Sequence, residues 1–131
     1  MLVKHLPQAK GVPVSPANQI QSLTIVIPAY NEARRLPPTL ERLVQYAQAS
    51  PLRVDLMVVD DGSSDGTAEV ARDTVGGRVP LTVLVNAANR GKGHSVRRGM
   101  LAATGDCVLF TDADLSTPIE DADKLLAAIV A

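Results

Sequence analysis

The chain has little of several features that would assign it to a common class of protein. Its 131 residues include one cysteine and three aromatic residues, so neither a disulfide framework nor aromatic stacking of single-stranded nucleic acid is expected. No apolar run approaches the ~18 residues that span a bilayer, and the amino terminus lacks the apolar core of a signal peptide. The 13 basic residues form no long block and the net charge is -1, which does not indicate nucleic-acid binding. We therefore expect a cytoplasmic protein with an aliphatic core.

What the chain does have is an uneven placement of its carboxylates. Six of the 14 come shortly after three apolar runs, residues 23–27, 56–59 and 107–111: Glu32, Asp60, Asp61, Asp65, Asp112 and Asp114. Such continuous runs indicate parallel strands buried on both faces, whose carboxyl ends share the edge where open α/β sheets bind ligands. Because carboxylates gathered there repel one another without a cation, the sequence predicts a metal-dependent site for a phosphate-bearing ligand.

Strand and helix patterns alternate along the chain. Residues 1–21 hold three prolines and no sustained periodicity, and we expect a loose amino-terminal arm there. Strands are predicted over residues 23–27, 54–59, 81–85 and 107–111, and helices over residues 34–49, 66–74 and 92–103. This order predicts an α/β domain over residues 22–131, with a Rossmann-like, doubly wound and mainly parallel sheet.

A last helix is predicted to start near Pro118, with Thr117 as N-cap and Glu120 completing a capping box. Its apolar face carries Ile119, Ala122, Leu126 and Ile129. This face either packs back on the sheet or meets further protein, and an exposed face would predict a homo-oligomer.

Three loop segments carry candidate ligand contacts. In residues 27–32, Tyr30 offers a flat ring face to a base, and Glu32 offers a hydrogen-bond acceptor. The simpler alternative is that this loop only leads the chain from the strand into the following helix. Asp60 and Asp61 diverge in an extended chain, so one is expected to reach the ligand while the other fixes the loop. In residues 89–93, two glycines and two cations before a helix suit a diphosphate, and a surface turn is the simpler alternative.

The triplet of residues 112–114 is weak as a motif, and its position gives it weight. Asp112 and Asp114 follow a strand, where residues two apart face the same side and can share a hard cation. The same triplet recurs at residues 121–123, inside the last predicted helix, where residues two apart point about 200° apart. Only the first triplet is therefore expected to bind an ion.

Taken in order, four segments resemble family-2 glycosyltransferases of the GT-A fold: residues 26–32, 58–67, 89–93 and 111–114. The continuations over residues 96–100 and 114–118 resemble dolichyl-phosphate and polyprenyl-phosphate β-glucosyltransferases. The residues that the resemblance implies for nucleotide binding are Pro28, Tyr30, Glu32, Asp60, Asp61, Arg90, Lys92 and Asp112. Those implied for the metal, Mg²⁺ or Mn²⁺, are Asp112 and Asp114. No residue stands out as a catalytic base.

The implied reaction is the inverting, metal-dependent transfer of glucose from UDP-glucose to a dolichyl or polyprenyl phosphate, at a membrane surface. Because a phosphate monoester is already an anion near neutral pH, a general base would matter less than for an alcohol. Relatives continue beyond this length with an acceptor-binding half. We therefore expect the chain to hold the donor-binding part, with weakened nucleotide-sugar binding and little turnover by itself.

Other functional classes are also compatible with the sequence. A nucleotide-sugar-binding module without transfer, or a family-2 enzyme with another acceptor, would carry the same motifs. A nucleotidyltransferase would favour a glycine-rich loop after the first strand, where this chain has residues 28–32 instead. A phosphoryl-transfer receiver domain would favour a lysine at the end of its last strand, and none follows residues 107–111 directly.

Overall fold

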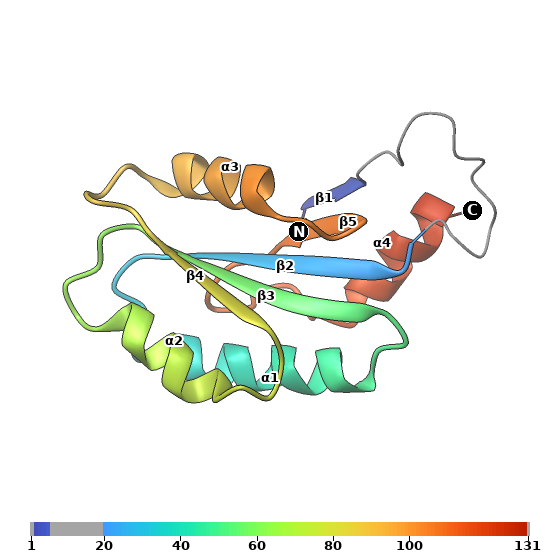
Figure 1. Ribbon diagram of the computed structural model, residues 1–131, viewed down its shortest axis with the longest axis horizontal. Coiled ribbons are helices and arrows are strands. Elements are labelled where there is room, and N and C mark those ends of the chain that lie inside the picture. Colours follow the sequence, from blue (N-terminus) through green and yellow to red (C-terminus); the bar gives the residue numbers. More distant parts are fainter. Residues whose placement is uncertain (1, 6–19, 131) are drawn as a thin grey trace.

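The centre of the fold is a five-stranded sheet with helices on both faces (Figure 1). The computed structural model describes residues 2–5 and 20–130. The strands are β1 (Leu2–His5), β2 (Ser22–Ala29), β3 (Arg53–Asp60), β4 (Leu81–Val85) and β5 (Cys107–Phe110). They lie in the order β1-β5-β2-β3-β4, with β2 to β5 parallel and β1 antiparallel at one edge. The predicted mainly parallel α/β fold is confirmed.

Four helices pack on this sheet: α1 (Leu36–Ala49), α2 (Thr67–Val75), α3 (Lys92–Ala102) and α4 (Asp121–Val130). The core under α1, α2 and α4 includes Leu23 and Ile25, whereas Val26 belongs to a smaller core under α3. Successive strand side chains point to opposite faces. Both faces are covered, which explains why the strands are continuously apolar. Among the described residues, no helix is both long and apolar enough to cross a membrane.

The strand β1 was not predicted. It pairs antiparallel with β5, from Leu2 opposite Phe110 to His5 opposite Cys107. A four-residue strand carries too little pattern to be recognised locally, and its partner lies about a hundred residues away in the chain. The rest of the predicted arm, residues 1 and 6–19, lies outside the described residues.

The last helix begins at Asp121, and the predicted start near Pro118 with its capping box is wrong. The N–H of Asp121 donates to the Pro118 carbonyl at 3.1 Å, so a separate turn precedes α4. Ile119, Ala122 and Leu126 nevertheless lie in the core. The apolar face therefore packs back on the sheet, which removes the reason for expecting self-association through these three residues.

Tyr46 of α1 ties that helix to α4, because its hydroxyl donates to Asp123 Oδ1 at 2.7 Å. Burial, followed by this contact with a carboxylate, raises the pKa of Tyr46 well above its ordinary value. We expect Tyr46→Phe to lower the free energy of unfolding in urea by about 1 kcal/mol, the usual worth of one such hydrogen bond. Tyr30→Phe, at a tyrosine that is 49% exposed, should change it little. Equal effects would show that this contact does not stabilise the fold.

Pro28 opens a gap between β2 and β5. The Thr111 N–H donates to the Val26 carbonyl on the β5 side, and the Asp61 N–H donates to the Ala29 carbonyl on the β3 side. Successive residues of a strand direct their backbone N–H and C=O groups to opposite sides. Residue 28 therefore faces the β5 side, just past the end of β5, and this is where proline has no N–H to donate. Pairing with β3 continues through Ala29. The two strands therefore separate where the strand order switches direction, the usual place for a ligand in such sheets.

Candidate functional site

A cavity of about 440 Å³ lies at this point, between the carboxyl ends of β2 and β5. Its lining residues are Pro28, Ala29, Tyr30, Glu32, Arg35, Asp61, Lys92, Ser95, Asp112, Ala113 and Asp114. Seven of the nine residues proposed from the sequence are among them, and Asp60 and Arg90 are not. Arg35 and Ser95 are polar lining residues that the sequence reasoning missed. The spacing of Arg35 three residues after Glu32 is the one signal that was available.

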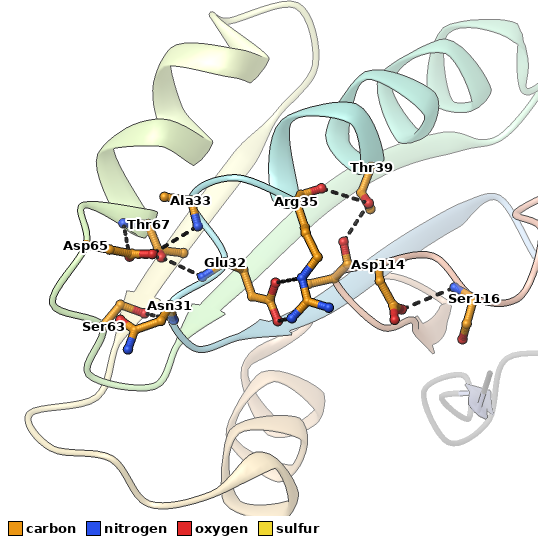
Figure 2. Close-up of polar contacts among 11 residues, drawn as sticks. Asn31, Glu32, Ala33, Arg35, Thr39, Ser63, Asp65, Thr67, Asp114 and Ser116 are labelled. Atoms are coloured by element: carbon orange, nitrogen blue, oxygen red, sulfur yellow. Dashed lines mark hydrogen bonds and ion pairs between the residues drawn. The ribbon is translucent and has the colours of Figure 1, made fainter.

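The loop after β2 is held from the side by the loop after β3 (Figure 2). The N–H groups of Asn31, Glu32 and Ala33 donate to the side-chain oxygens of residues that follow β3. Those acceptors are Ser63 at 2.8 Å, Thr67 at 3.1 Å and Asp65 at 3.2 Å. Residues 63–67 therefore position the cavity wall. The N-cap residue of α2 is Gly66, which has no side chain to cap the helix.

Glu32 and Arg35 form a two-pronged ion pair in the cavity wall (Figure 2). Arg35 Nε and Nη2 each donate to one Glu32 carboxylate oxygen at 2.7 Å. The Glu32 side chain is 15% exposed and the Arg35 side chain 64%. Each Glu32 oxygen keeps acceptor capacity for a ligand donor.

Asp61 organises the loop that leads into α3. Its carboxylate accepts hydrogen bonds from the N–H groups of Arg90 and Gly91 and from the Asn86 amide, all at 2.8 Å. Burial raises the pKa of Asp61, but these bonds and one involving the Ser95 hydroxyl outweigh it, so the pKa lies below its ordinary value. A charged carboxylate thus fixes the loop that carries Lys92 to the cavity.

This arrangement differs from the expected use of the glycine-containing loop. The backbone N–H groups of Arg90 and Gly91 are occupied by Asp61, so they do not face a diphosphate. Asp60 is as buried as Asp61, and its carboxylate accepts the Ser63 N–H at 3.0 Å. The prediction that the two neighbouring acids diverge holds, with Asp61 and not Asp60 at the cavity.

The turn after β5 presents two carboxylates to the cavity. Along residues 111–115, buried side chains alternate with more exposed ones, and Ala113 and Leu115 are the buried anchors after Thr111. The Thr39 hydroxyl of α1 donates to the Ala113 carbonyl, and this bond fixes the turn against α1. Asp112 and Asp114 therefore lie on the same side, as their spacing at a strand end predicts.

The second triplet behaves differently. Asp121 pairs with Lys124 at 3.7 Å, whereas Asp123 accepts the Tyr46 hydroxyl. Both residues lie in α4, and their partners lie on different elements, so the pair does not converge on one point. Strand-end position distinguishes the two triplets.

Lys92 is the lysine that contacts the acidic turn after β5. Its ammonium group contacts Asp112 Oδ1 and lies 5.9 Å from the centre of the Phe110 ring. The contact neutralises one of the two acids that the turn presents.

The donor set can be compared with what a divalent ion needs. Within the described part of the chain, no group of three or more His, Cys, Asp or Glu side chains is arranged to hold a metal. Asp112 and Asp114 supply carboxylate oxygens, and Mg²⁺-type ions commonly use one or two carboxylates with substrate phosphates and water. The residues fit such an ion provided that a phosphate-bearing ligand completes its coordination.

Known proteins of similar sequence are glycosyltransferases. A dolichyl-phosphate β-glucosyltransferase of Drosophila melanogaster is 42% identical over 82% of this chain and 35% of its own length. An undecaprenyl-phosphate 4-deoxy-4-formamido-L-arabinose transferase of Proteus mirabilis is 33% identical over 87% of this chain and 35% of its own length. The chain thus spans about a third of the length of these relatives.

Solved structures show the same core. The mannosyltransferase PcManGT of Pyrobaculum calidifontis, in complex with GDP-Man and Mn²⁺, matches with a TM-score of 0.70 and 31% identity. The match covers 94% of this chain and 35% of that one. S. aureus TarS in complex with UDP-GlcNAc matches with a TM-score of 0.68 and 26% identity, over 83% of this chain and 31% of that one. Both are glycosyltransferases of the GT-A fold.

The family described as glycosyl transferase family 2 matches residues 24–131, which include every described helix and all strands except β1 and the first two residues of β2. On the strength of that match, this chain belongs to glycosyl transferase family 2.

Proposed function

We propose that this chain binds the sugar donor of a glycosyltransferase that transfers a sugar to a polyprenyl phosphate, with UDP-glucose as the donor. The observation that carries the proposal is one cavity with two carboxylates and a lysine on one wall and a tyrosine and an ion-paired glutamate on the other. The names of the two relatives share a polyprenyl phosphate and differ in the sugar. The acceptor class is therefore better supported than glucose.

The two walls suit the two parts of a nucleotide sugar. Tyr30, half exposed after Pro28, offers a ring face to a base, and Glu32 can accept from the nucleoside. On the other wall, Asp112 and Asp114 would hold Mg²⁺ or Mn²⁺, which supplies Lewis-acid stabilisation of the leaving diphosphate when bound. The two neighbouring structures are complexes with nucleotide sugars, one of them with Mn²⁺, which supports a nucleotide sugar as the ligand and a divalent ion beside it.

The chain's own residues support the transfer in a simple way. The bond between the anomeric carbon and the diphosphate oxygen breaks, and a bond from an acceptor phosphate oxygen forms on the opposite face. Lys92 adds positive charge beside the position of the leaving diphosphate, where it can leave Asp112 for a phosphate oxygen. An acceptor phosphate is ionised near neutral pH, so the proposal assigns no general base.

Calorimetry with UDP tests the donor site. Because the cavity offers two carboxylates, we expect UDP and Mn²⁺ to bind together more tightly than either binds singly. Asp114→Asn should weaken UDP binding in the presence of Mn²⁺ by about tenfold or more, roughly 1.4 kcal/mol, and should not change binding in EDTA. Asp121→Asn, the same change in the triplet of α4, should bind like the unchanged chain. Equal affinities for the two variants, or no heat from a folded chain, would reject the donor site.

Transfer itself needs a separate assay. Because the chain spans about a third of the length of its relatives, we expect it to transfer only a little label from radiolabelled UDP-glucose to a polyprenyl phosphate in the presence of Mn²⁺. Asp114→Asn should abolish that label in the lipid fraction. Binding of UDP without any labelled lipid would instead favour a nucleotide-sugar-binding module.

A further inference from the structure

A second cavity, of about 410 Å³, lies at the carboxyl end of β4 beside the start of α3. It is lined by Val85, Asn86, Ala87, Arg90, His94 and Arg98, none of which lines the donor cavity. This is where the structure places Arg90, whose side chain the sequence had suggested for the diphosphate.

The charged side chains that line this cavity are all basic. No acidic residue lines it, and none occurs anywhere between Asp73 and Asp106, although the whole chain carries a net charge of -1. Among the described residues, neither Arg90 nor Arg98 makes an ion pair. Two arginines and a histidine at one cavity, without a carboxylate, leave positive charge that an anion from outside the chain can balance.

Arg98 is held in place from beneath. Its Nη1 donates to Asn86 Oδ1 at 2.7 Å, and the Asn86 amide nitrogen donates to Asp61 Oδ1 and to Ser95 Oγ. Asn86 is 5% exposed, so both ends of its amide are fixed by buried or partly buried partners. Within the described chain this is the one hydrogen bond of the Arg98 guanidinium, and its other N–H groups stay available to a ligand.

We propose that this second cavity binds the phosphate group of a ligand other than the sugar donor. Two guanidinium groups match the oxygens of a phosphate with paired hydrogen bonds, and the histidine adds a further donor. The same chemistry is offered by a soluble phosphate monoester and by a phosphatidic acid headgroup. The proposal does not depend on the donor site, because the two cavities share no lining residue.

Two probes distinguish the sources of the phosphate. Phenyl phosphate is titrated into the full chain by calorimetry. In a second experiment the chain is sedimented with vesicles of phosphatidylcholine, with or without phosphatidic acid. Binding of phenyl phosphate identifies a site for soluble monoesters. Sedimentation only with phosphatidic acid, without phenyl phosphate binding, identifies a lipid headgroup site.

Matched variants decide whether the second cavity is responsible. Arg98→Gln and Arg90→Gln should each weaken binding of the responding probe by about tenfold, the equivalent of one charge-assisted contact of about 1.4 kcal/mol. Arg97→Gln removes the same charge from the next position of α3, outside the cavity, and should leave binding unchanged. Lys92→Gln, in the donor cavity, should also leave it unchanged. The Arg90 side chain makes no hydrogen bond or ion pair with the described residues, so its variant tests the cavity even if Arg98→Gln does not fold.

The outcomes are separable. The proposal is supported, for either probe, if Arg90→Gln and Arg98→Gln weaken probe binding while Arg97→Gln and Lys92→Gln leave it unchanged. Weaker probe binding by Lys92→Gln would place the anion in the donor cavity. Equally weakened binding by Arg97→Gln would show attraction to positive charge in general. Either result overturns the proposal. Absence of binding to both probes overturns it as well, whether or not UDP binds.

Discussion

Replacing Asp61 with asparagine is expected to lower the free energy of unfolding at pH 7 by about 3 kcal/mol, a large share of the stability of a domain of this size. The carboxylate accepts the N–H groups of Arg90 and Gly91 and the Asn86 amide, each at 2.8 Å. An asparagine keeps one oxygen and presents its NH₂ group where the other oxygen accepted. At least one of these N–H groups, all buried or partly buried, then loses its acceptor and faces another donor. Urea unfolding of both proteins measures the difference.

The size of this effect should depend on pH. The folded-state pKa of Asp61 lies below its ordinary value, so the charged carboxylate contributes stability above the unfolded-state pKa of about 3.9. That contribution is lost as pH falls through the still lower folded-state pKa. The difference between the unchanged chain and Asp61→Asn should therefore be full near pH 7 and shrink below about pH 4.

Asp60 provides a matched control one residue away. It is equally buried, but its carboxylate accepts the single N–H of Ser63, which an asparagine oxygen can accept as well. We expect Asp60→Asn to cost about 1 kcal/mol or less. Equal losses for the two variants would show that burial, and not the set of donors around Asp61, decides the effect. The same Asp61 variant should also weaken UDP binding, because the loop that carries Lys92 loses its anchor.

Gly99→Ala is expected to destabilise the fold by about 2–3 kcal/mol, because there is no room for a methyl group where α3 lies on the sheet. A Cβ at Gly99 would lie 2.4 Å from Val26 Cγ1 and 3.1 Å from Val59 Cγ2. Val26 and Val59 are fully buried, so neither can move aside without displacing the core under α3. The helix must shift outward, and the midpoint of urea unfolding should fall accordingly.

Two further variants isolate the cause. Gly93→Ala lies in the same helix with nothing within 4 Å of the added Cβ, so it should be neutral or stabilising by up to about 1 kcal/mol. Val26→Ala removes the two Val26 methyl groups near the new side chain, including the one at 2.4 Å, and leaves the Val59 contact at 3.1 Å. Gly99→Ala should therefore cost much less in that background than in the unchanged chain. If Gly99→Ala behaved like Gly93→Ala, the close packing of α3 would be refuted.

Much of the fold was readable from local pattern. The strands predicted over residues 23–27, 54–59, 81–85 and 107–111 all lie in the observed strands β2 to β5, except that Thr111 falls just beyond β5. β1 and the start of α4 escaped prediction, because a four-residue edge strand has no periodicity of its own and a turn can take up the residues of a capping box. Pro28 ends pairing only toward β5, on the side where its N–H is missing, while pairing with β3 continues through Ala29.

The sequence by itself determined the order of the strands along the chain and the choice between the two aspartate triplets. Both follow from periodicity, since residues two apart share a side in a strand and diverge in a helix. Only the tertiary structure decided that Asp61 and not Asp60 lines the donor cavity, and that Arg90 lines a different one. The direction of these side chains depends on hydrogen bonds between residues that are far apart in the sequence. Examples are the bonds from the N–H groups of Arg90 and Gly91 to Asp61, which span 29 and 30 positions. No local pattern encodes a contact that forms only when two loops meet across the sheet edge.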